Sequence, residues 1–285
     1  MGSSNLPLRK GALNHYDTIF CYYKEYSDEI RATERLYGLQ EKNLIDVGFG
    51  LLDQLIENYN NSGLLENGLL ENRHPEKAHP ENEHPGNDKP QILVAPSWQK
   101  DNILEYCLKP LLEGLLKLDA DIIIRPHPEF VKRFPEKVKA ISDKYSDKKD
   151  AGALEIQTDF SSNSTVYNSD LVITDWSSIA QEFSLTTKKP SLFINTPMKV
   201  MNLEWRKIGI EPMDIWIRDR IGVSVDTDKL GDIDAIVLEL LDHKDDYAVA
   251  IEAVMSEHLF NMGHTDEAGG EYIIKQICNK RHAKQ

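Results

Sequence analysis

The sequence has little positive charge for its length. Its 33 Lys and Arg residues stand against 47 Asp and Glu residues, so the 285-residue chain carries a formal net charge of −14. Proteins that bind nucleic acid usually present a basic surface to the phosphate backbone, and no run of Lys and Arg occurs here. We therefore expect no nucleic acid among its partners.

Long apolar runs and closely spaced cysteines are also lacking. No stretch of about 18 apolar residues occurs, so we expect no transmembrane helix, and the N-terminus has no apolar core of a secretory signal. The three cysteines are scattered and form no CxxC pair, so we expect reduced thiols in a cytoplasmic protein and no metal site.

Residues 60–89 divide the sequence into two parts. A Gly-Leu-Leu-Glu-Asn unit occurs twice, and a five-residue unit beginning His-Pro then occurs three times. Such low-complexity sequence buries too little surface to order itself, which predicts a flexible linker. The alternative is a metal-binding histidine tract, but nothing fixes its coordination geometry. We predict a first region at 1–59, a linker at 60–89 and a second domain at 90–285.

Strands and helices alternate on both sides of this linker. The isoleucine run at 122–124 is typical of a strand that is buried on both faces, as in a parallel sheet. The alternation predicts an α/β fold with a Rossmann-like, doubly wound parallel sheet. We expect strands at 16–20, 44–47, 91–95, 121–125, 154–156, 171–174, 191–194 and 223–225. We expect helices at 25–37 with Gly38 as C-cap, 51–59, 101–118 with a break at Pro110, 130–145, 228–242, 245–260 and 266–281.

Three polar turns follow strands that we expect to be neighbours. They are Pro-Ser-Trp at 96–98, Arg-Pro-His-Pro-Glu at 125–129 and Asp-Trp-Ser-Ser at 175–178. Ligands of doubly wound sheets bind at the carboxyl ends of strands. The three turns are therefore the candidate site.

The Ser-Ser pair suits a phosphate. Ser178 and Gln181 fit a capping box, so a helix is expected to begin there. Free N–H groups and a partial positive charge mark a helix N-terminus, and the hydroxyls of Ser177 and Ser178 lie beside it. The alternative is that Ser178 is only a helix cap and Ser177 only a turn residue.

Arg125 and His127 leave the same strand end. Arg is a natural phosphate ligand, and His can donate a hydrogen bond to a phosphate or protonate a leaving group. The prolines on both sides of His127 stiffen the loop. The alternative is a surface histidine in a rigid turn.

The remaining candidates also have two interpretations each. Trp98, which follows Ser97, either stacks on a base or fills the core at a strand end. Asp175 either orients the Ser pair or forms the turn. Glu182 either accepts a hydrogen bond from a ribose hydroxyl or is an ordinary solvated side chain.

Taken together, the motifs resemble one family, the CDP-glycerol glycerophosphotransferases of teichoic-acid and capsule assembly. The quoted segments are ILVAPSW (92–98), IIIRPHPEF (122–130), YNSDLVITDWSSIAQEF (167–183) and FINTP (193–197). Residues 16–39 and 43–57 also resemble the end of the first Rossmann-like domain of that family.

The resemblance implies a GT-B arrangement, in which the second domain binds a CDP-linked donor and the first holds the acceptor. Arg125 and His127 would contact the donor pyrophosphate, with His127 as the catalytic residue. Ser177 and Ser178 would bind phosphate, and Glu182 would lie near the ribose. An acceptor hydroxyl would attack phosphorus of CDP-glycerol and release CMP, with no metal and no cofactor. The implied donor-binding set also contains Asp175, Ser97 and Trp98.

The sequence departs from the family in its first domain. The family carries a His-Gly motif there that supplies the proposed base, and no His-Gly pair occurs in this sequence. We expect residues 1–59 to be a remnant of the N-terminal acceptor domain, most of which is missing. A partner chain or a homo-oligomer would then complete that domain.

These observations favour one function and leave two others open. The leading hypothesis is a transferase that moves glycerol phosphate, or a related polyol phosphate, from a CDP-linked donor to a polyol-phosphate or glycan acceptor of the cell surface. Whether this chain acts alone is left open. The alternatives are a nucleotide-sugar-dependent capsule glycosyltransferase and a non-catalytic interaction protein on a degenerate transferase domain. The expected location is cytoplasmic, with a peripheral position at the inner face of the cell membrane as an option.

Overall fold

The computed structural model describes residues 5–62 and 89–282, which group into two compact units. Most of the predicted linker, 60–89, lies outside the described residues. The two units do not follow chain order, because the chain returns twice to the first unit after entering the second. The first unit contains the residues up to Glu57 together with 199–217 and those from Glu252 onward; the second contains 58–198 and 218–251.

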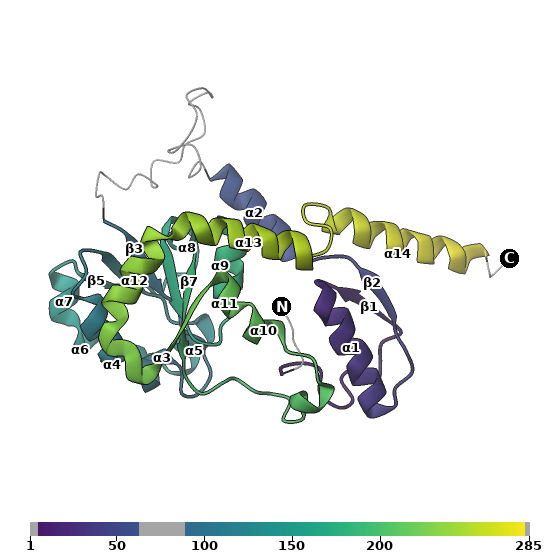
Figure 1. The fold of residues 1–285 in the computed structure, drawn as a ribbon, viewed down its shortest axis with the longest axis horizontal. Coiled ribbons are helices and arrows are strands. Elements are labelled where there is room, and N and C mark those ends of the chain that lie inside the picture. Colours follow the sequence, from purple (N-terminus) through teal and green to yellow (C-terminus); the bar gives the residue numbers. More distant parts are fainter. Residues whose placement is uncertain (1–4, 63–88, 283–285) are drawn as a thin grey trace, which may run out of the picture. The chain divides into compact units, whose positions relative to one another are not determined.

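The second unit is built on a parallel sheet of six strands (Figure 1). Its strand order is β5-β4-β3-β6-β7-β8, and every neighbouring pair is parallel. The predicted doubly wound α/β sheet is thereby confirmed. The strands are β3 (Gln91–Val94), β4 (Asp121–Ile124), β5 (Leu154–Ile156), β6 (Leu171–Thr174), β7 (Ser191–Asn195) and β8 (Gly222–Asp226).

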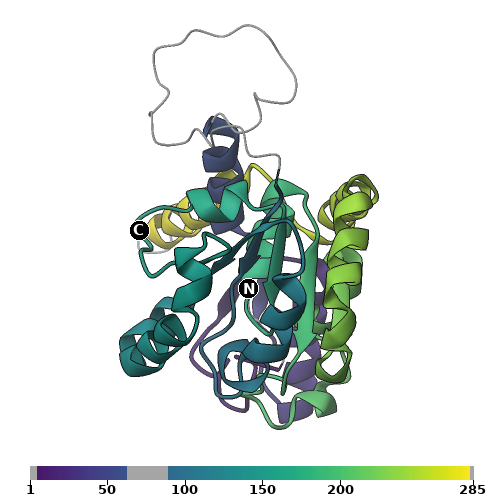
Figure 2. The same cartoon turned by 90° about the vertical axis from the view of Figure 1, so that its left-hand side faces the viewer.

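Helices cover both faces of this sheet, as Figure 2 also shows. Side chains alternate between the faces along a strand, so Ile92 and Val94 of β3 join one hydrophobic cluster while Leu93 joins another. Burial on both faces explains why the central strands are apolar throughout. The helices are α3 (Ile103–Tyr106), α4 (Leu108–Leu115), α5 (Pro128–Arg133), α6 (Pro135–Lys144), α7 (Ser146–Asp150), α8 (Ser164–Asn168), α9 (Ile179–Thr187), α11 (Arg218–Ile221), α12 (Ile233–Asp242), α13 (Lys244–His258) and the 3-10 helix η2 (Thr227–Asp232).

Two predicted helices are each divided in the structure. The segment 101–118 breaks at Cys107, not at Pro110, because Pro110 lies in the first turn of α4, where a missing N–H costs nothing. The segment 130–145 breaks at Phe134, because Pro135 takes the first position of a new helix, α6. The first residues of the predicted helix 228–242 form the 3-10 helix η2.

The first unit contains a second, smaller sheet. Strands β1 and β2 are parallel and pair Thr18 with Asn43, and α14 packs on them through Tyr272, whose ring lies edge-on to Phe20 at 5.7 Å. The predicted C-cap Gly38 is in the left-handed region that favours glycine, with φ 64°. The elements are β1 (Thr18–Cys21), α1 (Lys24–Tyr37), β2 (Asn43–Asp46), α2 (Gly50–Asn61), η1 (Trp205–Ile208), α10 (Met213–Trp216) and α14 (Thr265–His282).

Close backbone packing joins the ends of the first unit. A Cβ on Gly48 would lie 2.2 Å from the carbonyl oxygen of Phe260, so only glycine fits between these segments. Asp53 of α2 accepts hydrogen bonds from the backbone N–H groups of Gly263 and Thr265, at 2.8 and 3.2 Å. The last helix therefore belongs structurally with the first strands.

None of the helices within 5–62 and 89–282 is both long enough and apolar enough to cross a bilayer. In the same segments, no group of three or more His, Cys, Asp and Glu side chains is arranged to hold a metal ion.

Candidate functional site

The candidate site lies where the strand order of the large sheet reverses direction. From β3 the chain moves outward through β4 to β5, and from β6 it moves the opposite way through β7 to β8. The carboxyl ends of β3 and β6, which are neighbours, therefore flank a topological switch point, the usual ligand position in such sheets. The three predicted polar turns follow β3, β4 and β6.

A small cavity at this edge brings together residues from all three turns. Its volume is about 80 Å³. Arg125, His127 and Ser177 line it, and the remaining walls are apolar or proline: Leu93, Ala95, Pro96, Pro126, Pro128, Phe160, Val166 and Ile179. A whole ligand pocket usually measures about 300–1,000 Å³, so this cavity has room for only a part of a ligand.

Arg125 is the cation of the cavity. Its Nη2 donates to the carbonyl of Ser162 at 3.0 Å, and its guanidinium lies 5.4 Å from the ring centre of Phe160. Burial lowers the pKa of Arg125 from its ordinary value, and the charge of Asp159 opposes this shift. Its Nη1 is buried and has no hydrogen-bond partner among the described residues. A buried donor on a cation is suited to an anionic ligand group.

His127 has a defined hydrogen-bonding role at the start of α5. Its Nδ1 accepts a hydrogen bond from the backbone N–H of Glu129 at 3.1 Å, so the imidazole is the N-cap of the helix. An accepting Nδ1 carries no proton, which assigns the ring proton to Nε2. His127 thus combines a structural task with a donor on the other side of the ring.

The serine pair marks the start of α9, but not as a capping box. Ser178 stands at the N-cap position and makes no side-chain bond to the backbone of the first turn. Its hydroxyl donates instead to Oε1 of Glu182 at 2.9 Å, so the predicted capping box with Gln181 is wrong. The reason is that Ser178 already has helical dihedral angles, which turn its side chain away from the free N–H groups. Of the two serines, Ser177 lines the cavity and Ser178 does not.

Asp175 is turned into the protein. It is 1% exposed, and its two oxygens accept from the backbone N–H groups of Ser97 at 2.8 Å and Ile103 at 3.0 Å. The carboxylate therefore ties the turn after β6 to the turn after β3. Ser97 is buried as well, and its Oγ has no partner among the described residues. This arrangement gives Asp175 a positioning role within the site.

Trp98 lies beside His127 and is in contact with Arg133, a residue that was not predicted to belong to the site. The centres of the Trp98 and His127 rings are 6.4 Å apart, and the Arg133 guanidinium lies 4.9 Å from the Trp98 ring. Arg133 also donates to Glu129 at 2.9 Å, and this hydrogen bond lowers the pKa of Glu129. One face of the indole is thus in contact with a side chain of α5.

Two contributors to the site were not predicted. Arg133 follows Glu129 by four residues, the spacing of an ion pair on one helix face, and this signal was available in the sequence. Phe160, which lies against Arg125, follows no motif and belongs to an irregular segment after β5. Only the folded chain brings it to the strand end.

The strand order, with polar side chains at the switch point, defines a doubly wound α/β domain, a fold in which ligands bind at that point. A comparison with protein families leads further: the family described as CDP-Glycerol:Poly(glycerophosphate) glycerophosphotransferase matches residues 9–200. The chain belongs to this family. A comparison with curated protein sequences finds no match.

Solved structures similar to this chain include the wall teichoic acid polymerase TagF, with a TM-score of 0.52 and 17% identity over 93% of this chain and 58% of that chain. A TagF variant soaked with CDPG gives 0.54 and 18% over 93% and 58%. UDP-GlcNAc 2-epimerase of Methanocaldococcus jannaschii, in complex with UDP-GlcNAc and UDP, gives 0.52 and 15% over 92% and 61%. The predicted GT-B type fold is thereby confirmed, and the chain spans about three fifths of the TagF chains it matches.

Proposed function

We propose that the second unit binds the CDP-linked polyol donor of a glycerol phosphate transfer. The observation that carries this proposal is the meeting of Arg125, His127 and Ser177 in one cavity at the switch point of the sheet. A buried cation, a ring N–H and a hydroxyl suit a phosphate group, and the remainder of the nucleotide lies outside this small cavity. Membership of the glycerophosphotransferase family supports CDP-glycerol as the donor.

In the proposed reaction, an acceptor hydroxyl attacks the glycerol-bearing phosphorus of the donor. A bond forms between the acceptor oxygen and phosphorus, the hydroxyl proton passes to solvent, the bond from that phosphorus to the CMP oxygen breaks, and CMP leaves. Arg125 neutralises charge that develops on the phosphate oxygens, and Nε2–H of His127 donates to the same group. Asp175 keeps the turns after β3 and β6 at a fixed separation, which is a positioning effect. The acceptor that we propose is a polyol-phosphate chain.

Calorimetric titration of the full chain with CDP, CDP-glycerol and UDP tests the donor assignment. Arg125→Ala removes a charge-assisted hydrogen bond of about 1.5–3 kcal/mol, so CDP affinity is expected to fall about 10- to 100-fold. Ser177→Ala is expected to weaken binding by a smaller factor. Ser256→Ala is the matched control, because that hydroxyl bonds only within α13, to the carbonyl of Ala253.

Three outcomes would contradict the proposal in different ways. Tighter binding of UDP and UDP-sugars than of CDP-glycerol would indicate a nucleotide-sugar glycosyltransferase. Absence of binding for all three nucleotides, with the chain folded by its thermal melting curve, would favour the non-catalytic interaction protein. Equal affinity of the Arg125→Ala and unsubstituted chains would move the donor site elsewhere.

A further inference from the structure

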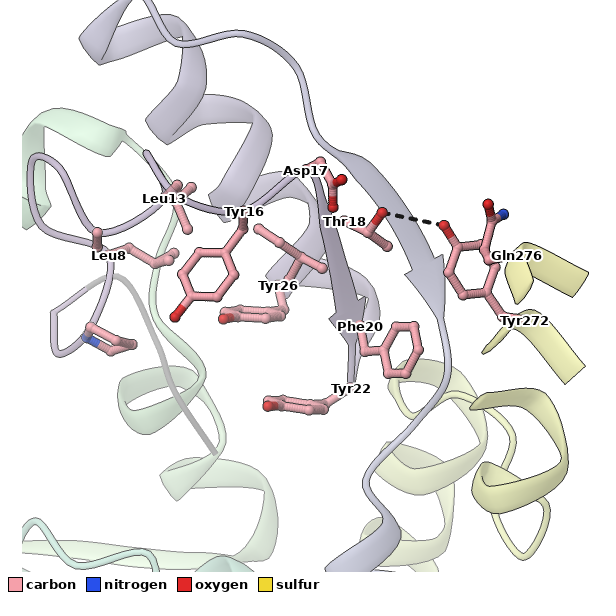
Figure 3. A pocket seen from close by; sticks show the side chains of 13 residues that line it. Leu8, Leu13, Tyr16, Asp17, Thr18, Phe20, Tyr22, Tyr26, Tyr272 and Gln276 are labelled. Atoms are coloured by element: carbon pink, nitrogen blue, oxygen red, sulfur yellow. Dashed lines mark hydrogen bonds between the residues drawn. The ribbon is translucent and has the colours of Figure 1, made fainter. Parts of the chain in front are cut away.

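The first unit contains a larger cavity that the donor site does not explain (Figure 3). Its volume is about 730 Å³. It lies between the segment that carries Leu8 and Leu13, the strand β1, and the last helix α14, and three tyrosines, Tyr16, Tyr22 and Tyr26, point into it.

This cavity runs along the edge of β1. Successive side chains of a strand point to opposite faces, so a cavity on one face would be lined by alternate residues. Here the successive residues 17–20 all line it. None of the β2 residues 43–46 does, which places the cavity at the edge opposite β2. Within the described part of the chain, β1 pairs with β2 alone.

The backbone of β1 offers hydrogen-bonding groups to the cavity. The carbonyl oxygens of Asp17 and Cys21 accept from Asn43 and Val47, on the β2 side. Backbone groups of alternate residues point to the same edge of a strand, so Ile19 also faces β2, whereas the N–H and C=O groups of Thr18 and Phe20 face the cavity. Two donors and two acceptors are therefore presented at the spacing of a strand.

The small sheet is underpacked compared with the large one. All four residues of β3 are buried, whereas in β1 only Cys21 is buried. Parallel sheets are normally covered on both faces, and a two-stranded sheet is marginal by itself. Natural free edges are usually protected by lysines, prolines or bulges on the edge strand, and β1 itself contains no Lys and no Pro.

We propose that the edge of β1 is a docking site for an extended strand of a second polypeptide, which enlarges the small sheet by β-augmentation. The occupant is an apolar strand flanked by basic residues, because the lining is mainly apolar and aromatic, its one charged side chain is Asp17, and the chain as a whole is acidic. Main-chain hydrogen bonds to Thr18 and Phe20 give affinity, and the tyrosines hold its side chains. About two fifths of each TagF chain lies outside the part that this chain matches.

Residue-resolved amide hydrogen exchange of the full chain tests this proposal. The probe is an acetylated, amidated octapeptide of alternating valine and threonine flanked by lysines, beside a peptide in which two central residues are proline. In the free chain, the amides of Thr18 and Phe20 are expected to exchange rapidly and that of Ile19 slowly. The octapeptide is expected to slow exchange at Thr18 and Phe20 at least about tenfold, and the proline peptide is not.

A variant that fills the cavity distinguishes docking from general stabilisation. Ala12→Trp places an indole in the cavity and is expected to abolish the peptide effect, whereas Ala253→Trp, the same change on an exposed helix position, retains it. The proposal is overturned by slow exchange of Thr18 and Phe20 in the free chain, which would mean that its own residues occupy the edge. It is equally overturned if the octapeptide fails to protect these amides, or if protection rises with protein concentration alone, as in pairing of two copies. No nucleotide is present, so the result is independent of the donor assignment.

Discussion

At the scale of single residues, Asp175 connects two turns of the proposed donor site through its carboxylate. It is buried, and its carboxylate accepts the N–H groups of Ser97, Ile103 and, at 2.6 Å, Trp176. Backbone donors that lose such a partner remain unsatisfied, because water does not reach them. Asp175 thus holds the turns after β3 and β6 in a fixed geometry before any ligand binds.

We predict that Asp175→Ala lowers the free energy of unfolding by about 3 kcal/mol, since hydrogen bonds to a charged group contribute about 1.5–3 kcal/mol each and are not additive. Urea unfolding of the purified chain measures this loss. Asp175→Asn keeps one acceptor oxygen, so its free energy of unfolding should lie between those of Asp175→Ala and the unsubstituted chain. Asp159→Ala is the control, because Asp159 is exposed and is expected to change stability by less than about 0.5 kcal/mol. Equal effects at both positions would contradict the assigned role.

Residue types and spacing indicated which turns would meet, but not the direction of each side chain. Arg125, His127 and Ser177 were predicted from chemistry that their types suggest, and they share one cavity. The sequence offered two roles for Asp175, and its inward orientation depends on N–H groups that lie 72 and 78 residues away along the chain. The capping box predicted for Ser178 does not form, because its backbone dihedral angles are helical and its hydroxyl donates to Glu182 instead. The sequence did not reveal these dihedral angles.

At the scale of elements, the pairing of β7 with β8 depends on one glycine. A Cβ on Gly222 would lie 1.6 Å from the carbonyl oxygen of Ser191, a distance that only separation of the strands relieves. Gly231 in η2 has open space at the same position. The two glycines therefore differ in the space that each leaves for a Cβ.

Gly222→Ala is predicted to destabilise the chain by about 1–3 kcal/mol, the usual cost of overpacking, whereas Gly231→Ala should change stability by less than about 0.5 kcal/mol. Thermal unfolding followed by circular dichroism compares the two variants under the same conditions. A Gly222→Ala chain as stable as the Gly231→Ala chain would show that β8 can move away from β7 at little cost.

Element types were easier to predict than element ends. Every predicted strand is present, because runs such as Ile122–Ile124 are apolar, β-branched and bounded by turn residues. The predicted break at Pro110 lies three residues after the observed break at Cys107. From the sequence alone, a proline in the first turn of a helix cannot be told from one in a helix interior. Short helices such as α8 lack a full period and gave no signal.

At the scale of the whole molecule, buried thiols report on global opening. Cys107 is buried at the junction of α3 and α4, and burial raises the pKa of its thiol to about 12. Burial also raises the pKa of Cys21, whereas Cys278 is exposed on α14. Only a thiolate is alkylated, so folding protects Cys107 by access and by charge.

We predict that iodoacetamide at pH 8 modifies Cys278 first. An ordinary thiol with a pKa of about 8.5 is about one quarter thiolate at this pH, and a thiol with a pKa of about 12 is about 0.01% thiolate, so Cys107 should react at least about 1,000-fold more slowly than an ordinary thiol. Peptide mass spectrometry after timed quenching measures both rates. The difference should vanish in 8 M urea, and rapid labelling of Cys107 in buffer would reveal an opening that the packing does not suggest.

The grouping of the chain into two units could not be predicted from local sequence patterns. Residues 199–217 and the last helix belong with the first strands, through contacts such as Asn202 Nδ2 to the carbonyl of Leu8, at a separation of 194 residues. No periodicity encodes such a return. The domain boundaries at 59 and 90 stay a prediction, since the residues between them lie largely outside the described segments.

The strand order of the large sheet has a consequence for biosynthesis. Gln91 of β3 donates to Asp170, which precedes β6 and lies 79 residues later in the chain. A ribosome adds about 5–20 residues per second, so the central strand of a nascent chain waits about 4–16 s for its second neighbour. During that interval the edge of β3 that will pair with β6 stays apolar and unpaired. We therefore expect β3 to pair with β6 late in synthesis, and we expect chaperones that bind extended apolar segments to act before that pairing.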